Sequence, residues 1–265
     1  MITNKKQNTL YVTYTYIFFW LLFLLTGSTM LWLGEGMIFM IMMSLCSWTP
    51  TIAFFVLFKK LYPNSSIRYF YKKAFKKRIN WKMILVTVAV QLFISITSVS
   101  IVIFTKGVSL YNLLDLSPQT IIMGVLLTFI QGATGEETGW RGFLQPSVER
   151  NFCVIKSSLI VGIIWGFWHT PLWLTSGYSG MQLLQYIFVF LVSIISLSIV
   201  IGICYNRSKN LFVPICIHFI FNFISTIFTG SALDIFTCFA VLYTLMAVGY
   251  IIWFKRYTSL TGFPL

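Results

Sequence analysis

The chain has 265 residues, of which 58% are hydrophobic and 18% aromatic, while 9% are charged. Together with a mean hydropathy of +0.85, this composition excludes a soluble domain with a polar surface and predicts a polytopic membrane protein. The formal net charge is +13, but the basic residues of a membrane protein are first expected in its cytoplasmic loops. We therefore expect no nucleic-acid partner.

Crossing the hydrocarbon core takes about 20 predominantly apolar residues. Eight segments meet this need, and a transmembrane helix is expected in each, at roughly 10–33, 37–58, 83–104, 119–145, 157–175, 182–204, 211–229 and 232–254. Tight connections are expected at Gly34-Glu35-Gly36 and at Gly230-Ser231. The fold class is therefore all-α. Residues 1–265 form a single transmembrane domain, because no internal repeat or linker divides the chain.

The first apolar segment follows Lys5 and Lys6 and imitates a signal peptide. It is too long for a signal h-region, and no clear cleavage site follows it. We expect it to be retained as the first helix.

The connection 59–82 carries nine of the 19 Lys and Arg residues. It is either a solvated cytoplasmic loop or an interfacial helix on anionic lipid. If both termini are cytoplasmic, every Lys and Arg except Lys106 falls on the cytoplasmic side. We therefore expect a multi-pass protein of the plasma membrane with both termini in the cytoplasm. The Phe-, Ile- and Lys-rich composition is typical of a bacterial protein.

The segment 119–145 contains the adjacent pair Glu136 and Glu137, in a chain with six acidic residues. An ionisable residue at membrane depth is costly and is a functional-site candidate by default. Glu137 and Arg141 are four residues apart and are expected to pair on one helix face. Glu136 points about 100° away and is the freer carboxylate. Small residues at spacings of three and four should let neighbouring helices approach closely: Gly132, Gly135, Gly139 and Gly142.

Two later segments contain the only histidines of the chain, His169 and His218, each among apolar residues. Asn222 follows His218 by four residues and shares its helix face. Pro171 should kink or loosen the helix just after His169. Counted from the cytoplasmic helix ends, these polar groups and Glu136 reach similar depth. Such a cluster requires a water-filled cavity, which we expect to open to the cytoplasm.

A carboxylate and an imidazole can together bind and deprotonate water, and His218 with Asn222 can donate hydrogen bonds to a developing oxyanion. These parts suit amide hydrolysis by activated water. Glu136, His169 and His218 are also adequate zinc ligands with an open position, and the residues alone do not separate the two mechanisms. The five cysteines form no CxxC pattern, so neither a thiolate metal site nor a disulfide framework is indicated.

Three motifs occur in order: Glu136-Glu137-x-x-x-Arg141, Trp165-x-x-x-His169 and His218-x-x-x-Asn222. This order resembles the motifs of the CAAX protease and bacteriocin-processing enzymes, the Abi family of intramembrane proteases. The resemblance covers residues 119 to about 229. The aromatic residue that opens the second motif is usually Phe, so Trp165 departs from the pattern.

The resemblance implies an eight-helix membrane fold with a cavity open to the cytosol. It implies that Glu136 and His169 position the attacking water and that His218 and Asn222 stabilise the oxyanion, while Glu137 and Arg141 support the site. Members are named metalloproteases, and a glutamate-dependent mechanism without catalytic metal is also argued for the family. Between these, we expect glutamate-activated water, with zinc as the alternative.

The expected function is hydrolysis of a membrane-associated peptide or protein. Prenylated CAAX substrates are not expected in a bacterium, whereas the family is linked there to bacteriocin self-immunity and peptide processing. Two alternatives come from other classes. One is a non-proteolytic membrane scaffold or immunity protein. The other is a proton-coupled transporter in which the Glu and His residues relay protons.

Overall fold

The computed structural model describes residues 4–34, 36–230 and 232–261. All eight predicted segments are helical in these ranges, and the strand content is limited to one isolated bridge between Leu114 and Phe228. The long helices are α1 (Asn4–Leu33), α5 (Trp81–Lys106), α11 (Gly180–Ser208) and α13 (Ala232–Thr261). The predicted tight connections include Glu35 and Ser231, which lie outside the described residues. Their neighbours Gly34 and Gly230 have left-handed φ angles of 70° and 55°.

Two predicted helices are split in two, and a third is short. The second is split into α2 (Met37–Ser47) and α3 (Thr49–Leu61), which meet at an angle of 56°. The fifth is split into α9 (Val154–Trp168) and α10 (Thr170–Leu174), so the chain breaks beside Pro171 as predicted. The seventh, α12 (Phe212–Thr226), has 15 residues and is shorter than the others.

The fourth predicted helix is a continuous run of α and π turns. It comprises α6 (Pro118–Leu127), a π-helical stretch Thr128–Ala133, α7 (Thr134–Glu137), a second π-helical stretch Thr138–Leu144, and α8 (Gln145–Val148). The two adjacent glutamates thus lie between two wider turns. π turns inside helices are rare and are found frequently at functional sites.

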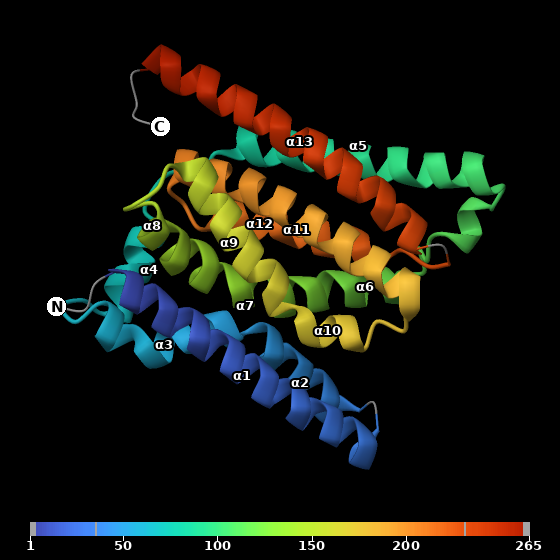
Figure 1. Cartoon of the computed structure of the whole chain (residues 1–265), viewed down its shortest axis with the longest axis horizontal. Helices are drawn as coiled ribbons and strands as arrows, with labels where there is room; N and C mark the ends of the chain where they lie inside the picture. Colours follow the sequence, from blue (N-terminus) through green and yellow to red (C-terminus); the bar gives the residue numbers. More distant parts are fainter. Residues whose placement is uncertain (1–3, 35, 231, 262–265) are drawn as a thin grey trace.

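The helices pack in the order seen in Figure 1. The central helix α11 lies between α9 and α13, α5 covers α12 and α13, and α1 packs on α2 and α3 on the other side of the molecule. Among the described residues, four helices are individually long and apolar enough to cross a membrane, and the number rises to five if the bent α2–α3 pair is counted as one span. Outward-facing side chains such as Phe93 and Ile96 are 67% exposed, as expected for lipid-facing positions. The chain is an all-α polytopic membrane protein.

The bundle has two distinct ends. One holds the starts of α1, α5, α9 and α12 together with the short helix α4 (Ile67–Ala74), and we name it the basic end. All Lys and Arg residues except Lys106 and the buried Arg141 belong to segments at this end. The other, named the opposite end, holds the starts of α2, α6, α11 and α13. A hydrogen bond from Asp115 N to Ile227 O and an ion pair between Lys106 and Asp234 connect its loops.

The predicted close approach at the glycines is confirmed. A Cβ at Gly139 would lie 2.7 Å from the carbonyl oxygen of Pro50 in α3, and one at Gly135 would lie 2.7 Å from the Trp48 ring. A Cβ at Gly132 would collide with the Asn222 amide. These glycines therefore leave room for the Pro50 backbone, the Trp48 ring and the Asn222 amide to lie directly against the glutamate-bearing segment.

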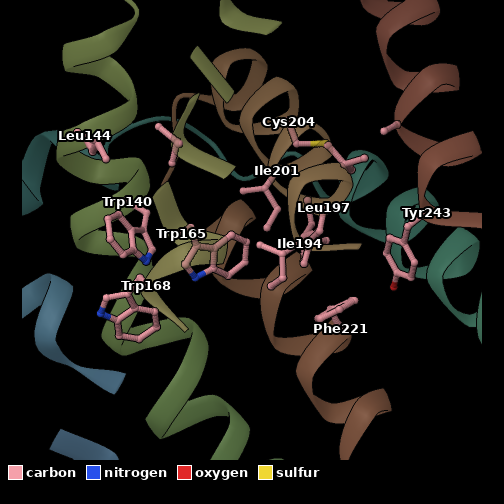
Figure 2. Close-up of a cluster of buried hydrophobic side chains, with 14 of the residues drawn as sticks. Trp140, Leu144, Trp165, Trp168, Ile194, Leu197, Ile201, Cys204, Phe221 and Tyr243 are labelled. Carbon is pink, nitrogen blue, oxygen red and sulfur yellow. The ribbon is translucent and has the colours of Figure 1, made fainter. Parts of the chain in front are cut away.

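Large buried side chains fill the bundle around the glutamate-bearing segment. Figure 2 shows the indoles of Trp140, Trp165 and Trp168 beside one another, with Leu197 and Ile201 of α11 packed on the far side of Trp165. The three indoles are at most 2% exposed. This packing holds the polar residues described next in a water-poor environment.

Candidate active site

Glu136 is a buried carboxylate held by a tryptophan. Its side chain is 4% exposed, and Oε2 accepts a hydrogen bond of 2.6 Å from the indole nitrogen of Trp165 in α9. A hydrogen bond between a donor and an ionised carboxylate is short and strong. Trp165 therefore supplies Glu136 with a hydrogen-bond donor that the usual Phe at this position would lack.

Glu137 is held by two partners and is fully buried. Oε1 accepts a hydrogen bond of 3.1 Å from Nη1 of Arg141, which confirms the predicted pair. The same oxygen lies 2.8 Å from Nδ1 of His218 in α12. Arg141 also donates to the Ser198 hydroxyl of α11 at 3.2 Å. Glu137 thus joins its own helix to α12, and Arg141 joins it to α11.

His218 lies against Glu137 rather than Glu136. We expected Glu136 and both histidines to form one site, yet the carboxylate that His218 contacts directly is that of Glu137. The reason is helical direction: two adjacent carboxylates point to different neighbouring helices, here α9 for Glu136 and α12 for Glu137. His218 still lines the same cavity as Glu136.

His169 and Asn222 complete the polar set. His169 ends α9, and its Nδ1 lies 2.8 Å from the backbone oxygen of Trp165, which fixes the ring and leaves Nε2 without a hydrogen bond in the described part of the chain. Nδ2 of Asn222 lies 3.1 Å from Nε2 of His218, as predicted for residues on one helix face. The two π-helical stretches and the hydrogen bond of Trp165 were not predicted.

Trp165 is the common neighbour of these groups. Its indole donates to Glu136, its ring packs edge-on against His218 with centroids 4.9 Å apart, and the Arg141 guanidinium lies over it at 4.5 Å. Its backbone oxygen holds His169. A tryptophan buried in an apolar helix usually finds a partner for its N–H, and this tendency is the one signal by which the contact could have been found from the sequence.

The polar residues line one cavity of about 470 Å³. Glu136, His169, His218 and Asn222 all border it, whereas Glu137 and Arg141 lie behind its wall. The rest of the lining is mainly apolar and includes Phe19, Phe190 and Phe221. The expected cavity therefore exists, but a cytoplasmic basic end and a cavity open to the cytoplasm do not hold together. It extends from Glu136 toward Thr226 and Phe236, away from the basic end for which we predicted a cytoplasmic position.

The donor set does not match the zinc alternative. Among the described residues, no three His, Cys, Asp or Glu side chains converge as ligands for one metal ion. Both ring nitrogens of His218 already have partners, Glu137 and Asn222. A set formed by Glu136, His169 and His218 would require these contacts to be exchanged. The five cysteines are free thiols.

Comparison with known proteins agrees with the motif positions. Residues 117–224, which contain all three motifs, match the family model described as type II CAAX prenyl endopeptidase Rce1-like. The resemblance to the CAAX proteases is confirmed. A curated relative, CAAX prenyl protease 2 of Methanococcus maripaludis, is 32% identical over 108 residues, which make up 39% of this chain and 40% of the relative. The chain therefore spans about two fifths of the length of the curated relative that it matches.

Proposed function

We propose that the protein is an intramembrane endopeptidase that hydrolyses a membrane-associated peptide or protein. The observation that carries the proposal is the polar floor of one apolar cavity, where Glu136, His169, His218 and Asn222 meet between membrane-spanning helices. The match of residues 117–224 to CAAX prenyl endopeptidases supports the same reaction class.

In the proposed mechanism, Glu136 and His169 hold the attacking water. Glu136 takes a proton from this water as it attacks the scissile carbonyl, and the same carboxyl then delivers the proton to the leaving amine. The Trp165 indole holds Oε2 at 2.6 Å, which leaves Oε1 for the water. General acid–base catalysis of this kind contributes about 10²- to 10⁴-fold to the rate.

The proposed oxyanion site is formed by His218 and Asn222. Beside the Glu137 carboxylate, Nδ1 of His218 carries a proton, and in the neutral ring Nε2 then accepts from Asn222. The second amide hydrogen of Asn222 is left to donate to the carbonyl oxygen of the substrate. Removing one such donor from an oxyanion site typically costs about 10²- to 10³-fold in kcat.

We further propose that the water is activated by glutamate without a catalytic metal. The contacts of both His218 nitrogens support this choice over a zinc site. Purified protein should keep its cleavage rate after prolonged treatment with EDTA and with 1,10-phenanthroline. If the rate falls after chelation and returns on addition of zinc, the metal-dependent alternative is correct.

The cellular setting is part of the proposal. We place the protein in a bacterial plasma membrane with the basic end, and so both termini, in the cytoplasm, because the distribution of Lys and Arg supports this orientation. Processing of a bacteriocin-like or signalling peptide, or immunity to one, is the proposed context.

The test is cleavage of membrane-bound peptides by the protein in proteoliposomes. Glu136→Ala, His169→Ala and His218→Ala should each lose cleavage while remaining folded in detergent. Glu149→Ala is the matched control, because Glu149 lies at the basic end and does not border the cavity. Persistent cleavage by all three folded variants would contradict the proposal. Lost ion flux would favour a transporter, and retained partner binding without any cleavage would favour a scaffold.

A further inference from the structure

The cavity lies on one side of the site only. Its floor is formed by Glu136, Trp165 and His218. Its walls lead from there to residues close to the opposite end of the bundle, near the starts of α11 and α13 and the ends of α10 and α12: Tyr186, Phe236, Leu172 and Thr226. Beyond Glu136 toward the basic end, the glutamate-bearing segment contributes no residue to this lining.

The space between the site and the basic end is filled. Arg141, Leu144 and Gln145, the next turns after the glutamates, are 0% exposed. Nε2 of Gln145 donates to the Ser158 hydroxyl at 3.2 Å, and the Ser198 hydroxyl donates to the Ser158 backbone oxygen at 2.9 Å. These contacts close the layer between the glutamate-bearing segment, α9 and α11.

The short helix α4 covers this layer from outside. Its Phe70 ring packs on Phe54 of α3 and would contact any side chain added at Gly142. The Tyr71 hydroxyl lies 3.1 Å from the Thr138 hydroxyl, one residue after Glu137. The Ala74 backbone oxygen accepts from Leu211 N at 2.9 Å, which ties α4 to the start of α12. A substrate approaching from the basic end therefore meets packed side chains.

The cavity walls fit an apolar ligand. Phe19, Phe190, Phe221 and Phe236 line them, and Glu136 is the one acidic residue while no Lys or Arg takes part. A peptide segment with apolar side chains can occupy such a volume and place a backbone carbonyl at the polar floor. A strongly charged peptide would leave its charges desolvated and unpaired.

We propose that the substrate enters the cavity from the opposite end and that it is the apolar segment of a peptide presented there. With the basic end in the cytoplasm, this is the extracytoplasmic side of the membrane. The identity of the ligand as a substrate rests on the proposed function, whereas the direction of access rests on the packing alone.

Thiol labelling in intact cells tests the direction of access. Ser225 is half-buried in the cavity wall, and Ser225→Cys places a thiol there without touching the catalytic groups. Phe223→Cys is the matched control on the same helix, outside the lining. The native Cys153 is exposed at the basic end and reports on that side. All native cysteines are kept, and mass spectrometry quantifies each labelled peptide after treatment with a membrane-impermeant maleimide.

We expect intact cells to label Ser225→Cys but not Cys153, and permeabilised cells to label both. Phe223→Cys should stay unlabelled in each case, because Phe223 is half-buried beside Gly124 of α6, and a thiol in apolar surroundings does not form the reactive thiolate. If both thiols or neither thiol is labelled in intact cells, the direction of access is refuted. Labelling of Cys153 alone would instead place the basic end outside the cell and overturn the membrane orientation.

A protection experiment tests the ligand class. An apolar peptide added outside should abolish labelling of Ser225→Cys, and a Lys-rich peptide of the same length should not. Equal protection by both would refute the apolar assignment. Labelling needs no turnover. If Ser225→Cys is labelled as expected but no peptide is cleaved, only the proposed function is overturned. If the only peptides that are cleaved are those supplied at the basic end, the direction of access is overturned and the proposed function stands.

Discussion

Replacing Trp165 by Phe tests whether the indole positions Glu136. Phe keeps an aromatic ring on α9 but removes the N–H that donates to Oε2 at 2.6 Å. A hydrogen bond to a charged group contributes about 1.5–3 kcal/mol. If this bond orients the carboxylate for proton transfer, its loss lowers kcat by about 10- to 150-fold, since each 1.36 kcal/mol is tenfold in rate. KM should change little, because the indole nitrogen faces Glu136 rather than the substrate.

The matched control is Trp140→Phe. Trp140 is also 0% exposed, its indole nitrogen has no hydrogen-bond partner within the described ranges, and it does not border the cavity. Both variants lose the same atoms from a packed interior, so both should lower the thermal midpoint in detergent. Only Trp165→Phe should lower kcat in a proteoliposome cleavage assay. Equal kcat values for the two variants would refute the positioning role.

Two further predictions concern packing and charge. Gly139→Ala should lower the free energy of unfolding by about 1–3 kcal/mol, because its Cβ would lie 2.7 Å from the Pro50 carbonyl oxygen. Gly249→Ala, with nothing within 4 Å of the added Cβ, should not lower it, and equal thermal midpoints for the pair would contradict this reasoning. Arg141→Leu removes one partner of a fully buried ion pair and should cost about 3–5 kcal/mol. The yield of folded protein should fall sharply and recover in part with Arg141→Lys, and an undiminished yield for Arg141→Leu would show that the pair is dispensable.

The sequence predicted those features that depend on local spacing. The two i,i+4 pairs, Glu137 with Arg141 and His218 with Asn222, form as expected because residues four apart share a helix face whatever the helix packs against. The break at His169 follows from Pro171 in the same way. The glycine spacing likewise predicted close packing, because a residue without a side chain lets a neighbouring element approach, whichever element that is.

Features that depend on which helices become neighbours were not predictable. The contact of His218 with Glu137 follows from the place of α12 beside the glutamate-bearing segment, which no spacing reveals. The π-helical stretches at Thr128–Ala133 and Thr138–Leu144 flank the two glutamates, and no residue spacing that we used predicts them. The direction of the cavity depends on the side chains that fill the basic end, and these come from several separate segments of the chain.

Parallel substitution of the two adjacent glutamates tests the central claim most directly. Glu136→Gln should fold and bind an apolar peptide like the parent, but should lose cleavage in a single-turnover assay. Glu137→Gln should instead lose stability, because Arg141 and His218 share its carboxylate in a fully buried position. Cleavage at the rate of the parent by a folded Glu136→Gln variant would contradict the assignment of Glu136 as the base.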